Sequence, residues 1–171
     1  MQLGLTIPLQ RFLKASKPPY GDPIDPFFCW DIHKVPSLSP STLIAVNASN
    51  RYALVFMGMT AGRWKRIPDI VTDGIAEALQ LDGYTSLQAE TYIAAAGTPE
   101  FTKTHGRRSV AGLNRAIDTL YVEAKRFDDR QLFQPQVSKA LNVELCHAAA
   151  FASSGLGYPR EFFRSEERRV G

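Results

Sequence analysis

Short runs of alternating or β-branched residues predict strands in five parts of the chain. They cover residues 2–6, 27–33, 42–46, 52–56 and 100–104. In the second run Phe28, Trp30 and Ile32 share one face, which we expect to point into the core. The third and fourth runs are separated only by the turn residues 47–51 and predict a hairpin.

Apolar residues that recur every three or four positions predict helices elsewhere. The strongest stripe runs from Val110 to Ala124, with Ser109 as its predicted N-cap. A capping box at 85–88 opens another helix. The remaining predicted helices cover residues 8–14 and 68–81 and a segment that begins at Pro135. We therefore predict an α+β fold, with a mainly antiparallel sheet of four to five strands and helices packed largely on one face.

The composition is that of one ordinary globular domain. The chain has 171 residues, of which 44% are hydrophobic and 22% charged, so it can bury a core without a metal or a disulfide. We predict a single domain over residues 1–160. The formal net charge of +3 is too small to identify nucleic acid or an anionic membrane as a partner by itself.

The two cysteines, Cys29 and Cys146, belong to no C-x-x-C pair, a usage typical of a reducing compartment. The first residues lack the charged and apolar regions of a signal peptide, and no stretch is apolar for the length of a membrane span. We therefore expect a soluble, cytoplasmic protein with no membrane partner.

One run at the start of the strongest predicted helix is distinctive: Arg108-Ser109-Val110-Ala111-Gly112-Leu113-Asn114. It accompanies Trp30, the hairpin from Leu43 to Tyr52, Phe101-Thr102-Lys103-Thr104, Leu141-Asn142 and Tyr158-Pro159. Together these features resemble a bacterial family, domain of unknown function 6933, over about residues 1–160. The family usually has a proline soon after the Leu-Asn pair, where this chain has Val143-Glu144-Leu145-Cys146. The resemblance implies a domain boundary but no activity.

The chain closes on Arg-Ser-Glu-Glu-Arg-Arg-Val-Gly at 164–171, a tail that recurs on unrelated proteins. We therefore expect residues 161–171 to be a disordered or non-native tail.

The segment 102–109 is the most suggestive for chemistry. It brings basic and hydroxyl side chains to the start of the strongest helix, where free N–H groups and the helix dipole favour an anion. The candidates are Lys103, His105, Arg107, Arg108 and Ser109. The alternative is structural: Ser109 caps the helix, Gly106 makes the turn, and the arginines are solvated or paired with carboxylates.

A second basic cluster, Arg63-Trp64-Lys65-Arg66, could stack a base on the indole while its cations contact phosphates. If the strand before it and residues 100–104 run in the same direction, the two clusters would share one sheet edge, with Arg51 as a further member. The alternative is a surface turn with Trp64 against the core.

The sequence offers weaker support for metal binding and for nucleophilic catalysis. Zinc would need Cys29, His33, His105, Cys146 and His147 to converge, and Asp69 with Asp73 would be the magnesium ligands. No nucleophile elbow is present. We predict no metal, no cofactor and no assigned catalytic residue. Gly112 would let another backbone approach closely, and Asn114 would bond a neighbouring loop; they and Trp30 are structural or ligand candidates.

These observations leave three functions open. The first is a non-enzymatic domain that holds an anionic partner, nucleic acid or another phosphate-bearing ligand, at 102–109. The second is an enzyme acting on a phosphorylated or nucleotide-like substrate, with Lys103, Arg107 and Arg108 stabilising charge and His105 as acid or base. The third is a protein-interaction module with an apolar patch near residues 146–158.

Overall fold

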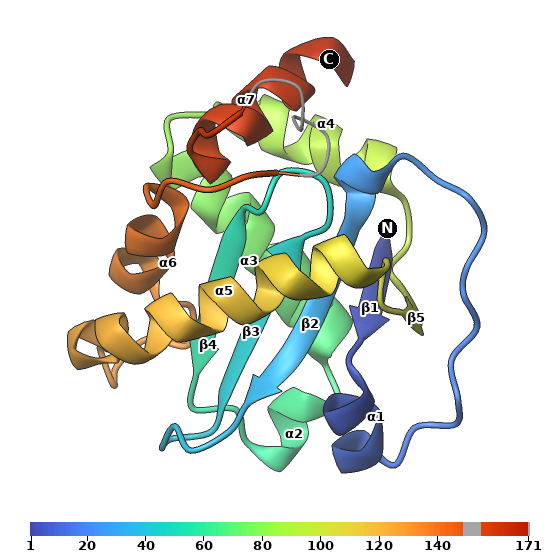
Figure 1. Cartoon of the computed structure of the whole chain (residues 1–171), viewed down its shortest axis with the longest axis vertical. Coiled ribbons are helices and arrows are strands. Elements are labelled where there is room, and N and C mark those ends of the chain that lie inside the picture. Colours follow the sequence, from blue (N-terminus) through green and yellow to red (C-terminus); the bar gives the residue numbers. More distant parts are fainter. Residues whose placement is uncertain (149–154, 171) are drawn as a thin grey trace.

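A five-stranded sheet organises the chain (Figure 1). The computed structural model describes residues 1–148 and 155–170. The strands are β1 (Gln2–Leu5), β2 (Cys29–Val35), β3 (Thr42–Asn47), β4 (Ala53–Met57) and β5 (Glu100–Lys103). Their order in the sheet is β4-β3-β2-β1-β5, so the first strand in the sequence lies inside the sheet, between β2 and the edge strand β5.

The sheet is mixed, and the prediction of a mainly antiparallel sheet is wrong. β2, β3 and β4 form an antiparallel meander that includes the predicted hairpin. β1 instead pairs in parallel with both β2 and β5. Parallel neighbours need long crossover connections, and here a helix and a loop join β1 to β2, while three helices precede β5. Strand-forming residues do not by themselves reveal which strand they will pair with.

The described residues form seven α-helices and two short 3₁₀ turns. The helices are α1 (Ile7–Leu13), α2 (Ala61–Trp64), α3 (Ile67–Leu81), α4 (Ser86–Ala96), α5 (Arg107–Glu123), α6 (Pro135–Asn142) and α7 (Pro159–Val170). The 3₁₀ turns are η1 (Pro26–Phe28) and η2 (Ala124–Arg126). The predicted helices at 8–14, 68–81, 85–97 and from Pro135 are confirmed, as is the capping box between Thr85 and Gln88.

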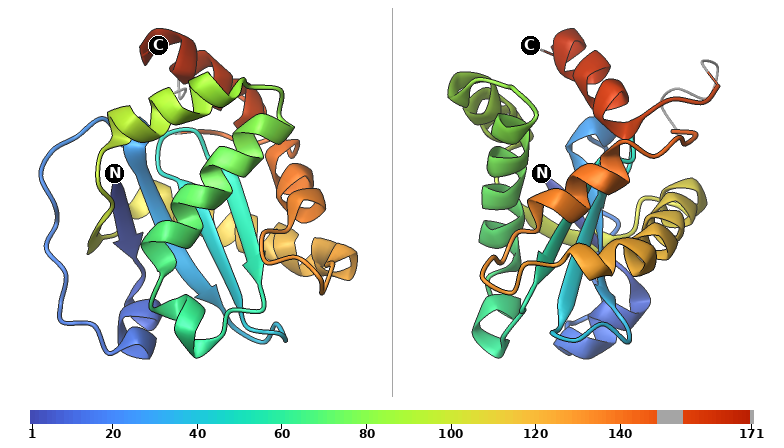
Figure 2. Two further views of the ribbon diagram at one scale, coloured as in Figure 1. Left: turned by 180° about the vertical axis from the view of Figure 1, so that it is seen from behind. Right: turned by 90° about the vertical axis from the view of Figure 1, so that its left-hand side faces the viewer.

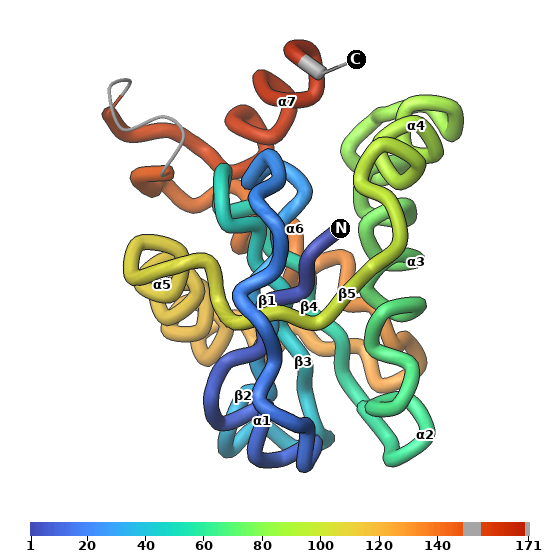
Figure 3. The backbone as a smooth tube through the Cα atoms, turned by 90° about the vertical axis from the view of Figure 1, so that its right-hand side faces the viewer, coloured from blue at the N-terminus to red at the C-terminus, as the bar shows by residue number. Residues whose placement is uncertain are grey.

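Helices cover both faces of the sheet, which corrects the prediction that they lie largely on one face. Figures 2 and 3 show α5 on one side and α3 and α4 on the other. Neighbouring residues of β3 accordingly enter different cores. Leu43 and Ala45 pack in the larger cluster beneath α3 and α4, whereas Ile44 and Val46 pack against α5 and α6. Strands buried on both faces are nearly continuously apolar, as β3 and β4 are.

Helix α6 covers the β4 edge of the sheet. Ser138 accepts a hydrogen bond from the Val55 amide at 3.0 Å. The Asn142 side chain both accepts from the Ala53 amide and donates to its carbonyl, at 2.7 and 2.9 Å. Side chains of α6 therefore take the place of a sixth strand beside β4, which prevents pairing with another chain there.

The residues that we expected to be a tail form most of α7. Phe163 is fully buried among the aromatic rings of Phe27, Tyr52 and Tyr92. The Glu166 carboxylate accepts hydrogen bonds from Ser49 and Asn50, at 2.5 and 2.7 Å. Through residue 170 the structure thus has a docked helix in the segment that we predicted to be a disordered or non-native tail. Residues 149–154, which belong to the segment near which we predicted an apolar patch, and Gly171 lie outside the described residues.

Candidate functional site

The loop between β5 and α5 is held by His105 and Asp31. Asp31 lies in the middle of β2 and is fully buried, on the face opposite Trp30 and Ile32 and therefore beneath α5. Its Oδ1 lies 2.7 Å from Nδ1 of His105 and accepts the His105 backbone N–H at 3.1 Å. One carboxylate thus fixes both the ring and the backbone of His105.

The partners of the His105 ring favour its protonated form. Burial by itself lowers the pKa of His105, but the interactions with Asp31 and Cys29 outweigh it and raise the pKa to about 9. The two side chains are 15% and 0% exposed, so the ion pair is largely shielded from solvent. The pair therefore stabilises the loop before α5.

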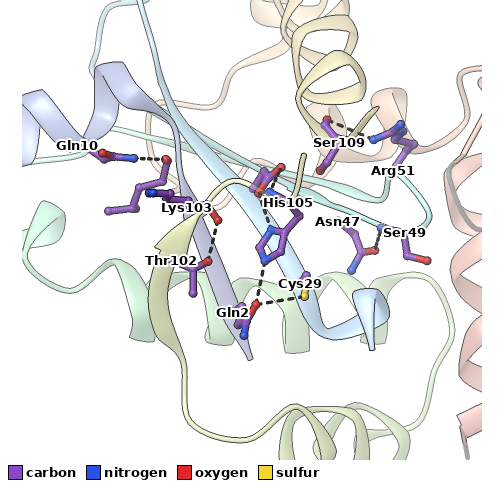
Figure 4. A network of polar contacts seen from close by, with 12 residues as sticks. Gln2, Gln10, Cys29, Asn47, Ser49, Arg51, Thr102, Lys103, His105 and Ser109 are labelled. Carbon is purple, nitrogen blue, oxygen red and sulfur yellow. Dashed lines mark hydrogen bonds and ion pairs between the residues drawn. The ribbon is translucent and has the colours of Figure 1, made fainter. Parts of the chain in front are cut away.

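Residues of β1 and β2 complete this cluster, as Figure 4 shows. The Gln2 side-chain oxygen lies 3.2 Å from Nε2 of His105 and 3.8 Å from Sγ of Cys29. Gly4 supplies the space, because a Cβ atom there would overlap the Asp31 carboxylate and press on the Thr104 backbone. We call Gln2, Cys29, Asp31 and His105 the Asp31–His105 clasp.

Two further loop candidates have structural roles. The Lys103 ammonium lies over the Tyr20 ring, 3.7 Å from its centroid, and so fastens the loop that follows α1. Ser109 is not the N-cap of α5, because the helix begins at Arg107 and Gly106 occupies the cap position at φ 95°. Ser109 instead lies within the first turn, with its hydroxyl buried and without a hydrogen-bond partner among the described residues.

The start of α5 is unusually basic. Its first turn contains Arg107 and Arg108, no acidic residue and no capping side chain. Cations at this end oppose the helix dipole. The Asp31 carboxylate, which accepts the N–H of His105 just before the helix, supplies an internal negative charge. An anion from solution is therefore not needed on the sheet side of the helix start.

Arg51 crosses from the hairpin turn to α5. Its guanidinium donates to the carbonyls of Arg108 and Ser109, at 2.5 and 3.2 Å. It rests directly against Gly112, where a Cβ atom would overlap it. Gly112 therefore admits a side chain of the hairpin, rather than the backbone that we predicted.

A groove of about 450 Å³ opens on the outer side of this contact. Arg51, Arg108 and Arg115 line it together with Gly112 and His147, and its remaining described lining is Ala111 and Ala148. None of these residues is acidic, so guanidinium groups dominate the local charge. We call this the arginine groove.

The three arginines differ in how far they are already paired. Arg51 is half-buried and bonded to α5, whereas Arg115 donates to the Leu145 carbonyl at 3.1 Å and lies 3.9 Å from Glu144. Arg108 is exposed, and its side chain has no hydrogen bond or ion pair within residues 1–148 and 155–170. Arg108 is thus the cation that is freest to bind a ligand.

The second basic cluster lies elsewhere. β4 and β5 do run in the same direction, but they are the two edges of the sheet, and the Arg63 to Arg66 segment lies at α2, on the face of α3 (Figure 3). Trp64 is buried, edge-on to Phe12 at 5.0 Å, so it offers no surface to a base. Arg63 donates to the Gly58 carbonyl and Arg66 pairs with Asp69, while Lys65 is exposed.

Trp30 and Asn114, the other candidates, are not among the described residues that line the groove either. Trp30 is fully buried and donates to the Tyr92 hydroxyl at 3.1 Å, so it belongs to the core. Asn114 is exposed on α5 and is not among the described residues that line the groove. The part of the chain that the structure describes contains no group of three His, Cys, Asp or Glu residues placed to hold a metal, and no helix long and apolar enough to cross a membrane.

The sequence reasoning missed Arg115 and His147 as groove residues. Arg108, Gly112 and Arg115 are spaced four and three apart, which places them on one face of a helix. That spacing could have identified the face. The contributions of Arg51 and His147 depend on contacts between distant parts of the chain.

A family model matches residues 2–162, a span that contains the whole clasp and the described groove. The chain belongs to the DUF6933 family. The family's description, "Domain of unknown function", assigns it no activity. No curated protein and no solved structure matches the chain. The function of this DUF6933 domain must therefore be argued from its own geometry.

Proposed function

We propose that this domain is a binding module that holds the phosphate group of an anionic ligand in the arginine groove. The observation that carries the proposal is the convergence of Arg51, Arg108 and Arg115 on one groove whose described lining is free of carboxylates. Guanidinium groups present paired N–H donors that match phosphate oxygens. The groove volume also falls in the range of small-molecule sites.

This proposal moves the site from the loop 102–109 to the outer face of α5. Of the loop candidates, only Arg108 is among the described residues that line the groove. Lys103 and His105 have partners elsewhere within the chain. The position of His105 outside the groove also supports binding over catalysis. The enzymatic alternative needs His105 near the substrate, and its ring is held by Asp31 beneath the helix start.

The experiment is titration calorimetry with inorganic phosphate and with pyrophosphate, on the full chain and on Arg108→Gln. Removing one charge-assisted contact costs about 1.4 kcal/mol, so we expect the Kd to rise about tenfold. Arg107→Gln is the matched control, because it removes the same charge from the same helix turn at a residue that does not line the groove. We expect this control to change the Kd by less than about twofold.

A parallel arm separates small ligands from nucleic acid. Fluorescence anisotropy of a short labelled single strand and of its duplex, followed across a salt series, reports phosphate contacts along a backbone. Oligonucleotide binding whose log–log salt slope falls by about one in Arg108→Gln would identify nucleic acid as the source of the phosphate. Absence of binding to every probe, or equal losses in Arg107→Gln and Arg108→Gln, would overturn the proposed site.

A further inference from the structure

A second, smaller cavity adjoins the arginine groove on its inner side. It measures about 40 Å³ and shares Arg51, Gly112, Arg115 and His147 with the groove. The two spaces are therefore neighbours, and a ligand that extends from one into the other would contact both. The inner cavity therefore bears on which anion the groove selects.

The additional lining of the inner cavity is mainly apolar. It consists of Ala53, Ala116, Leu141 and Cys146, with Glu144 as the exception. Ala53, Leu141 and Cys146 are buried, and small side chains leave the space between them. These side chains give the cavity an apolar wall beside its guanidinium groups, and an apolar group of a few atoms can pack against that wall.

Glu144 makes the inner cavity electrostatically different from the arginine groove. Its carboxylate accepts a hydrogen bond from Thr119 and lies 3.9 Å from Arg115. Arg51 and Arg115 line both spaces, but only the inner cavity adds a carboxylate and only the groove adds Arg108, so an anionic group is favoured in the groove. A ligand with an anionic end and an apolar end would bind in one orientation.

We infer that the preferred ligand is a phosphate monoester with a compact branched or short alkyl group, with the phosphate in the arginine groove and the alkyl group in the inner cavity. The inference rests on the proposed function, because it assigns the phosphate to the groove. The inference adds the alkyl group of the ligand, which the arginines do not recognise.

The test is a calorimetric series with inorganic phosphate, methyl phosphate and isopropyl phosphate on the full chain. Each buried carbon increases affinity about threefold to fourfold, so methyl phosphate should bind about threefold and isopropyl phosphate about thirtyfold more tightly than inorganic phosphate. Equal affinities across the series, with measurable phosphate binding, would overturn the inference and leave the proposed function standing. Absence of phosphate binding would overturn both.

Ala116→Leu fills the inner cavity from α5 and should abolish the gain from the alkyl group while inorganic phosphate still binds. Asn114→Leu is the matched control, because it adds a leucine to the same helix at an exposed residue outside both spaces. This control should retain the full gain. A gain that survives Ala116→Leu would show that the alkyl group binds elsewhere and would overturn the inference.

A second measurement does not depend on how Ala116→Leu folds. Cys146 lines the inner cavity, and its alkylation by iodoacetamide can be followed by mass spectrometry in the unmodified chain. At matched saturation, isopropyl phosphate should slow the alkylation of Cys146 several-fold more than inorganic phosphate does. Equal protection by the two ligands would contradict an alkyl group in the inner cavity.

Discussion

The Asp31–His105 clasp and the arginine groove lie on either side of the start of α5, and both contain charged groups. In the clasp, His105 bonds Asp31 and Gln2, so its ring nitrogens have partners from the chain itself. In the groove, Arg108 has no such partner among the described residues, and the space beside it is open.

This difference between His105 and Arg108 indicates which charged residues stabilise the fold and which are available to a ligand. A buried charge with partners inside the chain stabilises one conformation, and removing it costs stability. An exposed cation that faces an open groove contributes little to stability and is available to an anion. Residues 105 and 108 are close in the sequence, yet the structure gives them these opposite roles.

The largest expected effect is on the clasp, from Gly4→Ala. The new methyl group overlaps the Asp31 carboxylate and presses on the Thr104 backbone, which cannot move aside like a flexible side chain. We expect the free energy of unfolding to fall by about 3 kcal/mol in chemical denaturation. Gly62→Ala is the control, because nothing lies within 4 Å of its Cβ position, and it should be neutral or slightly stabilising. Similar losses in both variants would mean that Gly4 does not make room for the clasp.

The next effect is that of Asp31→Asn. The variant keeps the shape of the side chain but removes the partner of the His105 cation, so we expect a loss of about 2 kcal/mol at neutral pH. His105 then loses its interaction with the Asp31 carboxylate, one of the two that raise its pKa, so we expect the pKa of His105 to fall. NMR titration of the His105 ring reports this directly, and an unchanged titration in Asp31→Asn would show that the pair is not the cause.

The same pair predicts how stability depends on pH. The folded pKa of His105, about 9, exceeds the ordinary value of 6.5, so the folded state binds the proton more tightly. The stabilisation is complete below pH 6.5 and is lost as the pH rises through 9. Denaturation of the unmodified chain and of His105→Gln across this window isolates the effect, because other groups titrate in both. Parallel pH profiles would rule out His105 as the source.

A smaller effect, on the groove alone, is expected from Gly112→Ala. The added methyl group displaces the Arg51 guanidinium from its bonds to α5. We expect the Kd for inorganic phosphate to rise about fivefold, close to 1 kcal/mol. Alanine in place of glycine favours the helix by up to about 1 kcal/mol, so the stability should change little. Unchanged phosphate affinity would mean that the position of Arg51 is not important for binding.

Local chemistry made much of the fold predictable. The apolar stripe of α3 and the box between Thr85 and Gln88 depend on residues a few positions apart, and both were read from the sequence. Strand partners were not, because β1 pairs with β2 and β5 across long connections. The helices on the second face could have been inferred from β3 and β4, which are apolar at successive positions.

The candidate site was likewise predictable from the sequence only in part. The basic character of 102–109 was visible, but its division between clasp and groove was not, because Asp31 is 74 residues from His105. The helical spacing of Arg108, Gly112 and Arg115 was available, whereas the insertion of Arg51 beside Gly112 depends on the packing of the hairpin turn.

The most direct test measures two quantities in two variants. The free energy of unfolding and the Kd for inorganic phosphate are determined for Asp31→Asn and for Arg108→Gln under conditions where both remain folded. We predict that Asp31→Asn loses stability and keeps its phosphate affinity, whereas Arg108→Gln keeps its stability and loses about tenfold in affinity. If Arg108→Gln were destabilised as much as Asp31→Asn, or bound phosphate as tightly as the unmodified chain, the separation of clasp and groove would be contradicted.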